Sequence, residues 1–105
     1  MKTYALKITD TALADMNAIY DYIAEQLLSP DTAMGQYDRI ASTIETLASF
    51  PERCALLRVP FQDCGEMRQL RVNNYTVVFV VGEAAVTVLR VLYSASDIGP
   101  RLLEQ

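Results

Sequence analysis

The first residues of the chain alternate between apolar side chains and smaller or polar ones. Tyr4, Leu6 and Ile8 fall on the same side of an extended segment. A repeat of two residues is typical of a strand that is buried on one face. The pattern therefore predicts a strand over residues 3–9.

A helical repeat follows, with apolar residues three or four positions apart. It predicts an amphipathic helix over residues 11–28, with Asp10 or Thr11 as the N-cap. The apolar stripe consists of Ala12, Met16, Ile19, Ile23 and Leu27. The acidic residues are assigned to a solvated polar face and comprise Asp15, Asp21 and Glu25. The tyrosines in or beside the helical stripes are assigned to the core or an interface and comprise Tyr20, Tyr22 and Tyr37.

A second helix is predicted over residues 30–49. Ser29 can cap this helix, Pro30 suits its first position, and Pro51 ends it. The two helices are nearly contiguous and must form a hairpin. Gly35 inside the second helix is unfavourable by about 1 kcal/mol relative to alanine, which close packing against the first helix would explain.

Residues 67–93 are rich in β-branched and aromatic side chains and predict an antiparallel meander of three strands. The strands cover 67–72, 75–81 and 85–93, and Asn73-Asn74 forms the first turn. The middle strand is apolar almost throughout, which indicates burial on both faces.

The two-residue turn also predicts the register of the first two strands. Val72 opposite Tyr75 places Arg68 opposite Phe79, and opposed residues point to the same side of a sheet. One face then carries Arg68, Leu70, Val72, Tyr75, Val77 and Phe79. The other face carries Gln69, Arg71, Thr76, Val78 and Val80.

The remaining segments complete an α+β chain. Residues 50–65 have no clear period and are predicted to be irregular, with one helical turn. Ser96 or Asp97 is the expected cap of a short C-terminal helix, whose apolar residues are Ile98, Leu102 and Leu103. The order of elements is a strand, a helical hairpin, three strands and a short helix.

The composition of the chain excludes several kinds of functional site. The chain has 105 residues, which is one domain's worth, so residues 1–105 are expected to form a single domain. There is no histidine, which removes the usual neutral-pH base and the commonest zinc ligand, so we expect no metal site and no cofactor. Cys54 and Cys64 are expected to be reduced thiols. The N-terminus lacks an apolar signal segment and no stretch is long enough for a bilayer, so we expect a cytoplasmic protein without a membrane partner. We also expect no small-molecule ligand.

Charge is divided unevenly along the chain. The net formal charge is −4, but residues 10–52 hold eight acidic residues and one basic residue, Arg39. Residues 53–101 hold six arginines and four acidic residues. Either these are ordinary solvated charges, or the arginine-bearing half receives an acidic partner through guanidinium forks.

Three residues are candidates for a catalytic site. Arg68, Arg90 and Tyr93 lie on strands predicted to share a sheet. Two arginines and a tyrosine can stabilise a phosphorane and move a proton during RNA cleavage. The same three residues can equally form salt bridges and hydrogen bonds within the domain or at an interface.

The order of elements and several short motifs resemble the RelE/ParE toxin superfamily of bacterial type II toxin–antitoxin systems. The first helix resembles the family's "A…L..I..YI" pattern, and Leu47 to Pro51 resembles the "L…P" that ends the second helix. Residues 68–75, RQLRVNNY, resemble the "R-x-L-x-V-x-N-Y" hairpin. Residues 88–93, VLRVLY, together with Asp97, resemble the closing "V-x-R-V-L-H/Y…R-D".

The resemblance implies a small α+β toxin of a plasmid stabilisation system, with an antitoxin whose extended C-terminal part wraps it. RelE-like members cleave mRNA on the ribosome, and ParE-like members inhibit DNA gyrase. Family positions and their neighbours give the expected partner-binding residues, which are Arg68, Arg71, Tyr75, Arg90, Tyr93 and Asp97.

Departures from the pattern of the RelE-like nucleases favour the hypothesis of a ParE-like toxin. Thr76 stands where RelE-like nucleases usually place an arginine, and residues 93–96 replace their basic residues or histidine. We therefore expect a ParE-like toxin that binds gyrase. The alternatives are a ribosome-dependent endoribonuclease using Arg68, Arg90 and Tyr93, or an inactive toxin kept as an antitoxin-binding module.

Overall fold

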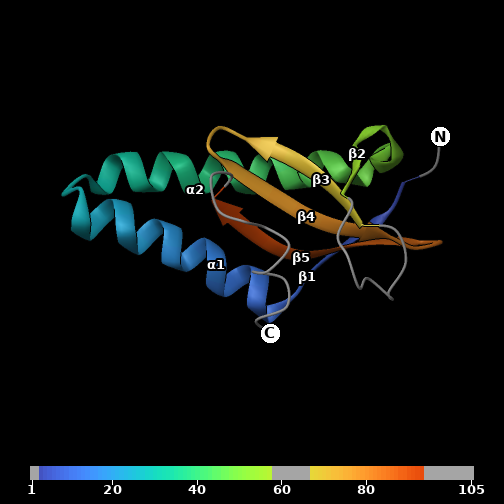
Figure 1. Ribbon diagram of the computed structural model, residues 1–105, viewed down its shortest axis with the longest axis horizontal. Coiled ribbons are helices and arrows are strands. Elements are labelled where there is room, and N and C mark those ends of the chain that lie inside the picture. The colour runs from blue at the N-terminus through green and yellow to red at the C-terminus, as the bar shows by residue number, and fades with distance from the viewer. Residues whose placement is uncertain (1–2, 58–66, 94–105) are drawn as a thin grey trace.

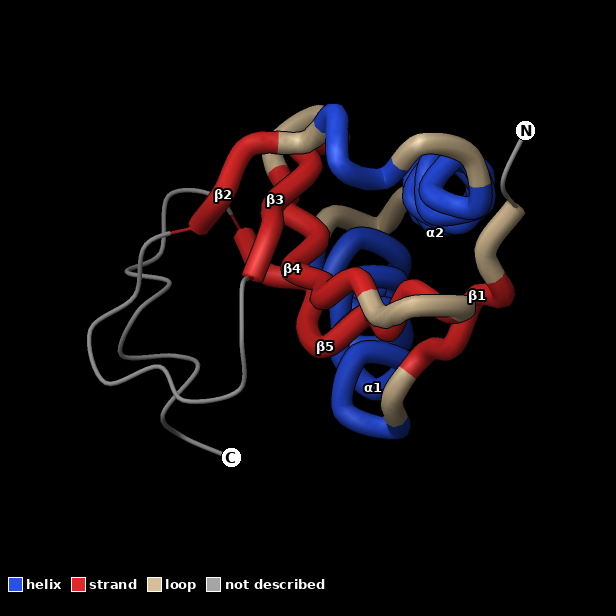
Figure 2. Tube along the Cα trace, turned by 90° about the vertical axis from the view of Figure 1, so that its right-hand side faces the viewer, coloured by secondary structure: helices blue, strands red, loops and turns tan. Residues whose placement is uncertain are grey.

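Five strands form one mixed sheet in the order β1-β5-β4-β3-β2 (Figures 1 and 2). The computed structural model describes residues 3–57 and 67–93. The strands are β1 (Ala5–Ile8), β2 (Ala55–Leu57), β3 (Met67–Val72), β4 (Tyr75–Val81) and β5 (Ala85–Tyr93). Two helices, α1 (Asp10–Asp21) and α2 (Pro30–Glu45), form an antiparallel hairpin beside the sheet, which confirms the α+β class.

The meander of β3, β4 and β5 is confirmed with the predicted bounds. Val72 lies opposite Tyr75 and Arg68 opposite Phe79, so the predicted register is correct. Asn73 adopts a φ of 53°, a left-handed conformation that asparagine tolerates in two-residue hairpin turns. This hairpin places Tyr75 at the beginning of the central strand.

Two further strands extend the meander. β1 pairs with β5 in parallel, with Ala5 opposite Ala85, so the first and last described strands are neighbours. β2 pairs antiparallel with β3, with Leu56 opposite Arg68. The segment containing β2 was predicted to be irregular, and that prediction is wrong for these three residues. The predicted helical turn in the same segment is confirmed as a 3-10 turn, Pro51–Arg53.

The main core lies between the helices and one face of the sheet. Its fully buried members include Ile40 of α2 and Phe79 of β4, with Ala12 and Met16 from α1. A smaller cluster on the opposite face contains Met67, Val78 and Leu92. β4 is therefore buried on both faces, as predicted.

α1 begins one residue earlier than the capping pattern predicted. Thr9 is the N-cap, and its hydroxyl oxygen accepts from the amide of Ala12 at 3.0 Å. The same hydroxyl donates to the carbonyl of Leu89 at 3.0 Å, and the amide of Thr9 donates to Val88 at 3.1 Å. Thr9 thus continues the pairing of β1 with β5 and begins the helix.

The hairpin departs from two regular helices at its connection. α1 ends at Asp21 and continues as a π-helical turn over Tyr22–Gln26, so the predicted helix over 11–28 is interrupted. Leu28 then adopts a φ of 53°. The hairpin extends beyond the end of the sheet (Figure 1). No helix within residues 3–57 or 67–93 is both long and apolar enough to cross a membrane.

The second helix begins at Pro30 as predicted, and a 3-10 turn over Thr46–Ala48 follows it. Ser29 makes no capping bond to a backbone amide, since its hydroxyl donates to that of Thr32 at 2.7 Å. Gly35 is exposed, and a Cβ there meets no atom within 4 Å. The prediction that close packing explains Gly35 is therefore wrong. Cys54 is a buried free thiol, and Cys64 and the predicted C-terminal helix lie outside the described residues.

Candidate partner-binding site

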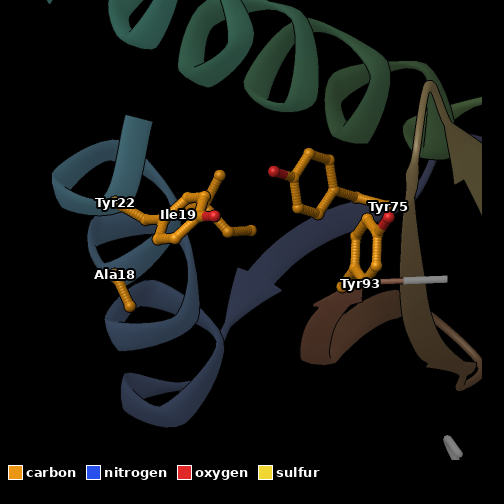
Figure 3. Close-up of a pocket in the computed structure, with 5 residues that line it drawn as sticks. All are labelled: Ala18, Ile19, Tyr22, Tyr75 and Tyr93. Atoms are coloured by element: carbon orange, nitrogen blue, oxygen red, sulfur yellow. The ribbon is translucent and has the colours of Figure 1, made fainter. Parts of the chain in front are cut away.

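A groove lined by three tyrosines opens where α1 leaves the sheet. It has a volume of about 410 Å³, and we call it the aromatic groove. Figure 3 shows its two walls, one from α1 and its π-helical turn and one from the ends of β4 and β5. Its lining residues are Ala18, Ile19, Tyr22, Tyr75 and Tyr93.

The sheet wall is built by strand pairing. Tyr75 is the first residue of β4 and Tyr93 the last of β5, and the two lie directly opposite each other. Their ring centroids are 5.9 Å apart with an interplanar angle of 63°. Aromatic pairs favour such an edge-to-face arrangement. Tyr93 is 51% exposed, and Tyr75 is half-buried. A partner can therefore cover Tyr93 without rearranging the core.

The helical wall depends on the π-helical turn. Tyr22 is the first residue of this turn and is 57% exposed, while its phenol points across the groove in Figure 3. The sequence assigned Tyr22 to the core or an interface, and the exposed ring is consistent with an interface.

The groove combines apolar walls with phenol hydroxyls. Burial raises the pKa of Tyr75, and the neighbouring phenols of Tyr93 and Tyr22 raise it further. Its hydroxyl therefore stays protonated at neutral pH and remains available as a hydrogen-bond donor. A groove of this kind suits an apolar or aromatic side chain that carries one polar group.

Arg90 is bound within the chain rather than exposed. Its Nε donates to Oδ2 of Asp15 at 2.7 Å and its Nη2 donates to Oδ1 at 3.1 Å, a bidentate ion pair. The amide of Val91 donates to Oδ2 of the same carboxylate at 3.0 Å. Asp15 therefore covers the part of the β5 edge that lies beyond its pairing with β1.

The prediction that Asp15 lies on a solvated polar face is wrong. The side chain is 16% exposed and faces the sheet, whereas Asp21 and Glu25 are exposed as predicted. Helical spacing contained a signal for this, because Asp15 lies three residues after Ala12 and four before Ile19. An acidic residue on the apolar stripe of a helix requires a buried partner.

Arg68 also holds two parts of the chain together. Its Nη1 donates to the carbonyl of Cys54 at 2.7 Å and to that of Glu52 at 3.1 Å. The phenol of Tyr4 donates to the side chain of Glu52 at 2.7 Å. These bonds attach the segment before β2 to β3 and to the residue that precedes β1.

The three residues considered for RNA cleavage do not converge within the described part of the chain. Arg90 is bound to Asp15 of α1, whereas Arg68 is bound to the carbonyls of Glu52 and Cys54, before β2. Tyr93 instead makes an edge-to-face contact with the ring of Tyr75 in the aromatic groove.

The other expected partner-binding residues fall in different places. Arg71 is exposed on β3, opposite Thr76. Asp97 lies outside the described residues. Tyr75 and Tyr93 share the aromatic groove, but the helical residues Ala18 and Ile19 were not predicted to belong to it. They lie one turn before the π-helical turn, whose position the apolar pattern did not reveal.

Comparisons with known proteins agree with this fold. The solved structure of a chromosomal ParDE system from P. aeruginosa is similar to this chain, with 25% identity, a TM-score of 0.72, and coverage of 89% of this chain and 98% of that one. An archaeal RelE–RelB complex from Pyrococcus horikoshii has a TM-score of 0.60 at 15% identity, covering 89% and 97% of the two chains. The toxin–antitoxin complex RelBE2 from Mycobacterium tuberculosis has a TM-score of 0.59 at 19% identity, covering 91% and 97%. No match was found among curated proteins.

The family comparison covers most of the chain. Residues 6–98 match the model of the ParE toxin of the type II toxin–antitoxin system parDE. This range contains the helical hairpin and all of β3, β4 and β5. The chain belongs to the ParE toxin family of type II toxin–antitoxin systems.

Proposed function

We propose that this ParE-type toxin arrests growth by binding DNA gyrase and that a cognate antitoxin neutralises it. The observation that carries the choice of a protein target is the state of the two arginines. Arg90 is paired with Asp15, and Arg68 binds two carbonyl groups of its own chain. Both guanidinium groups are therefore bound within the chain, which favours a structural role for them over catalysis of RNA cleavage.

The aromatic groove is the proposed antitoxin site. Its phenols and apolar walls suit a large apolar side chain projecting from an extended peptide. Exposed Arg71 and the excess of arginine in residues 53–101 suit acidic residues in that peptide. We assign partner contacts to Arg71, Tyr75 and Tyr93, and a structural role to Arg68 and Arg90.

The target is tested by gyrase supercoiling with increasing amounts of the purified chain and with ribosomes absent. Inhibition, or trapped cleaved DNA, at near-stoichiometric toxin is expected. A folded chain that leaves supercoiling unchanged at large excess contradicts the proposed target. Primed ribosomes with message then test the nuclease alternative, for which the expected result is no cleavage.

The antitoxin site is tested by titrating labelled toxin with the antitoxin encoded beside it. Tyr93→Ala is expected to weaken binding at least tenfold, because it removes a half-exposed ring from one wall of the groove. Tyr20→Ala is the matched control, since Tyr20 lines a separate cavity with Tyr37. Equal affinities for the two variants contradict the assignment of the groove.

A further inference from the structure

The connection between α1 and α2 contains a leucine in a conformation that favours glycine. Leu27 is the C-cap of the π-helical turn, and Leu28 follows with a φ of 53°. Glycine is the usual residue at this position after a helix, because a side chain in the left-handed region is strained. Leucine therefore brings no conformational advantage to the turn.

Packing within the chain does not explain the leucine either. The Leu28 side chain is 83% exposed, the largest exposed fraction among the large apolar residues of the described chain. A leucine that is both strained and solvated contributes little to folding. Strain without a folding benefit occurs at functional positions, and at Leu28 it coincides with a cluster of exposed apolar side chains.

Other apolar side chains are exposed in the same connection. Tyr22 is 57% exposed, Leu27 58% and Met34 50%. We call these residues and Leu28 the hairpin tip. Exposed apolar residues that occur singly are ordinary, whereas four within thirteen consecutive residues indicate an interaction surface.

The charges around the hairpin tip indicate the chemistry of the partner. Asp21, Glu25 and Asp31 are exposed, and residues 21–34 contain no lysine or arginine. This negative rim opposes an acidic partner and favours one with basic side chains around an apolar pocket. An acidic antitoxin segment that suits the exposed Arg71 of β3 does not suit the carboxylates around Leu27 and Leu28.

We propose that the hairpin tip is the surface that meets the toxin's target protein, with Leu28 inserted in an apolar pocket rimmed by basic residues. This inference rests on the proposed function in so far as the target is gyrase. The tip projects beyond the sheet (Figure 1), so it reaches a partner surface without obstruction from the strands. The target and an antitoxin in the aromatic groove then meet at Tyr22, and occupation of the groove obstructs the tip.

Leu28→Gly and Leu28→Asn separate this role from folding. Both residues tolerate the left-handed conformation, so both variants are expected to unfold at the wild-type temperature or above it. Burial of one leucine corresponds to about a 10- to 100-fold change in affinity. We therefore expect at least a tenfold rise in the toxin concentration for half-inhibition of supercoiling.

Phe50→Gly is the matched control. Phe50 also has a positive φ, 49°, and is 68% exposed, but it lies beyond the far end of α2. It shares the strain and the exposed apolar side chain without belonging to the hairpin tip. Phe50→Gly is expected to inhibit gyrase as strongly as the wild type.

Growth arrest after induced expression provides a readout that does not depend on the identity of the target. Wild type and Phe50→Gly are expected to arrest growth. At equal expression, cultures that express either Leu28 variant are expected to retain at least ten times more viable cells than the wild-type culture. If wild type arrests growth without inhibiting gyrase, the proposed target fails and the growth assay still decides the role of the tip. Full toxicity of folded Leu28→Gly and Leu28→Asn overturns the inference, as does a wild-type chain that does not arrest growth.

Discussion

Replacement of Asp15 by alanine tests whether the edge of β5 is held by a single carboxylate. This carboxylate accepts three hydrogen bonds, from Nε and Nη2 of Arg90 at 2.7 and 3.1 Å and from the amide of Val91 at 3.0 Å. The Arg90 side chain is 9% exposed and that of Asp15 16%. The variant therefore removes the charge that compensates a largely buried guanidinium.

The expected loss is large for a protein of this size. Removing one partner of a buried ion pair destabilises by about 3–5 kcal/mol. The residual exposure of Asp15 places this case at the lower end, so we expect a fall of about 3 kcal/mol in the free energy of unfolding. At about 4 °C per kcal/mol, the melting temperature falls by about 12 °C. Small domains have total stabilities of about 5–15 kcal/mol, so this variant loses a substantial part.

Urea unfolding followed by circular dichroism measures the change. Asp21→Ala is the matched control, because Asp21 lies on the same helix but is exposed, and it is expected to change stability by less than about 0.5 kcal/mol. Asp15→Asn keeps an acceptor for Val91 but loses the charge, so its loss should lie between those of the two alanine variants. Combining Asp15→Ala with Arg90→Ala isolates the coupling between the pair. An Asp15→Ala protein as stable as Asp21→Ala refutes the assigned role of this carboxylate.

Three further predictions concern single side chains. Gly35→Ala is expected to raise the free energy of unfolding by about 0.5–1 kcal/mol in urea titrations, because a Cβ meets open space there, and a loss of stability contradicts the observed geometry. Folding raises the pKa of Tyr75 above its ordinary value of 10.0, so its contribution to stability is complete below pH 10 and is lost as the pH rises through the folded pKa. Tyr75→Phe should reduce this alkaline loss in pH-dependent unfolding, and an unchanged pH slope disproves it. Burial raises the pKa of the Cys54 thiol, so in a Cys64→Ser background iodoacetamide at about pH 8 should react with it more slowly in folded than in urea-unfolded protein, and equal rates refute this.

The meander was predictable because local signals agree there. A two-residue asparagine turn lies between two dense runs of β-branched and aromatic residues, and the strand bounds and register followed from it. The outer strand β2 was not predictable in this way. It has three residues without alternation, and it forms against β3 while Arg68 binds the carbonyl of Cys54 just before it.

The candidate site was predictable only in part. Tyr75 and Tyr93 were reached through motif resemblance, and strand pairing brings them together. The helical wall of the aromatic groove depends on the π-helical turn that begins at Tyr22, which leaves no mark in a periodic pattern of apolar residues. Asp15 was misassigned because its partner is 75 residues away in the sequence, although its position on the apolar stripe was visible.

The adjacency of β1 and β5 has a consequence for synthesis of the chain. Thr9 and its acceptor Leu89 are 80 residues apart. The contacts of β1 and Thr9 with β5 therefore cannot form until most of the chain has been translated. At about 5–20 residues per second, that interval is about 4–16 s. Pairings this distant in sequence slow folding, because the loop must close before its contacts form. A nascent or truncated chain that ends before β5 lacks Arg90, the partner of Asp15, and the Tyr93 wall of the groove, so the proposed antitoxin site forms only once β5 has been synthesised.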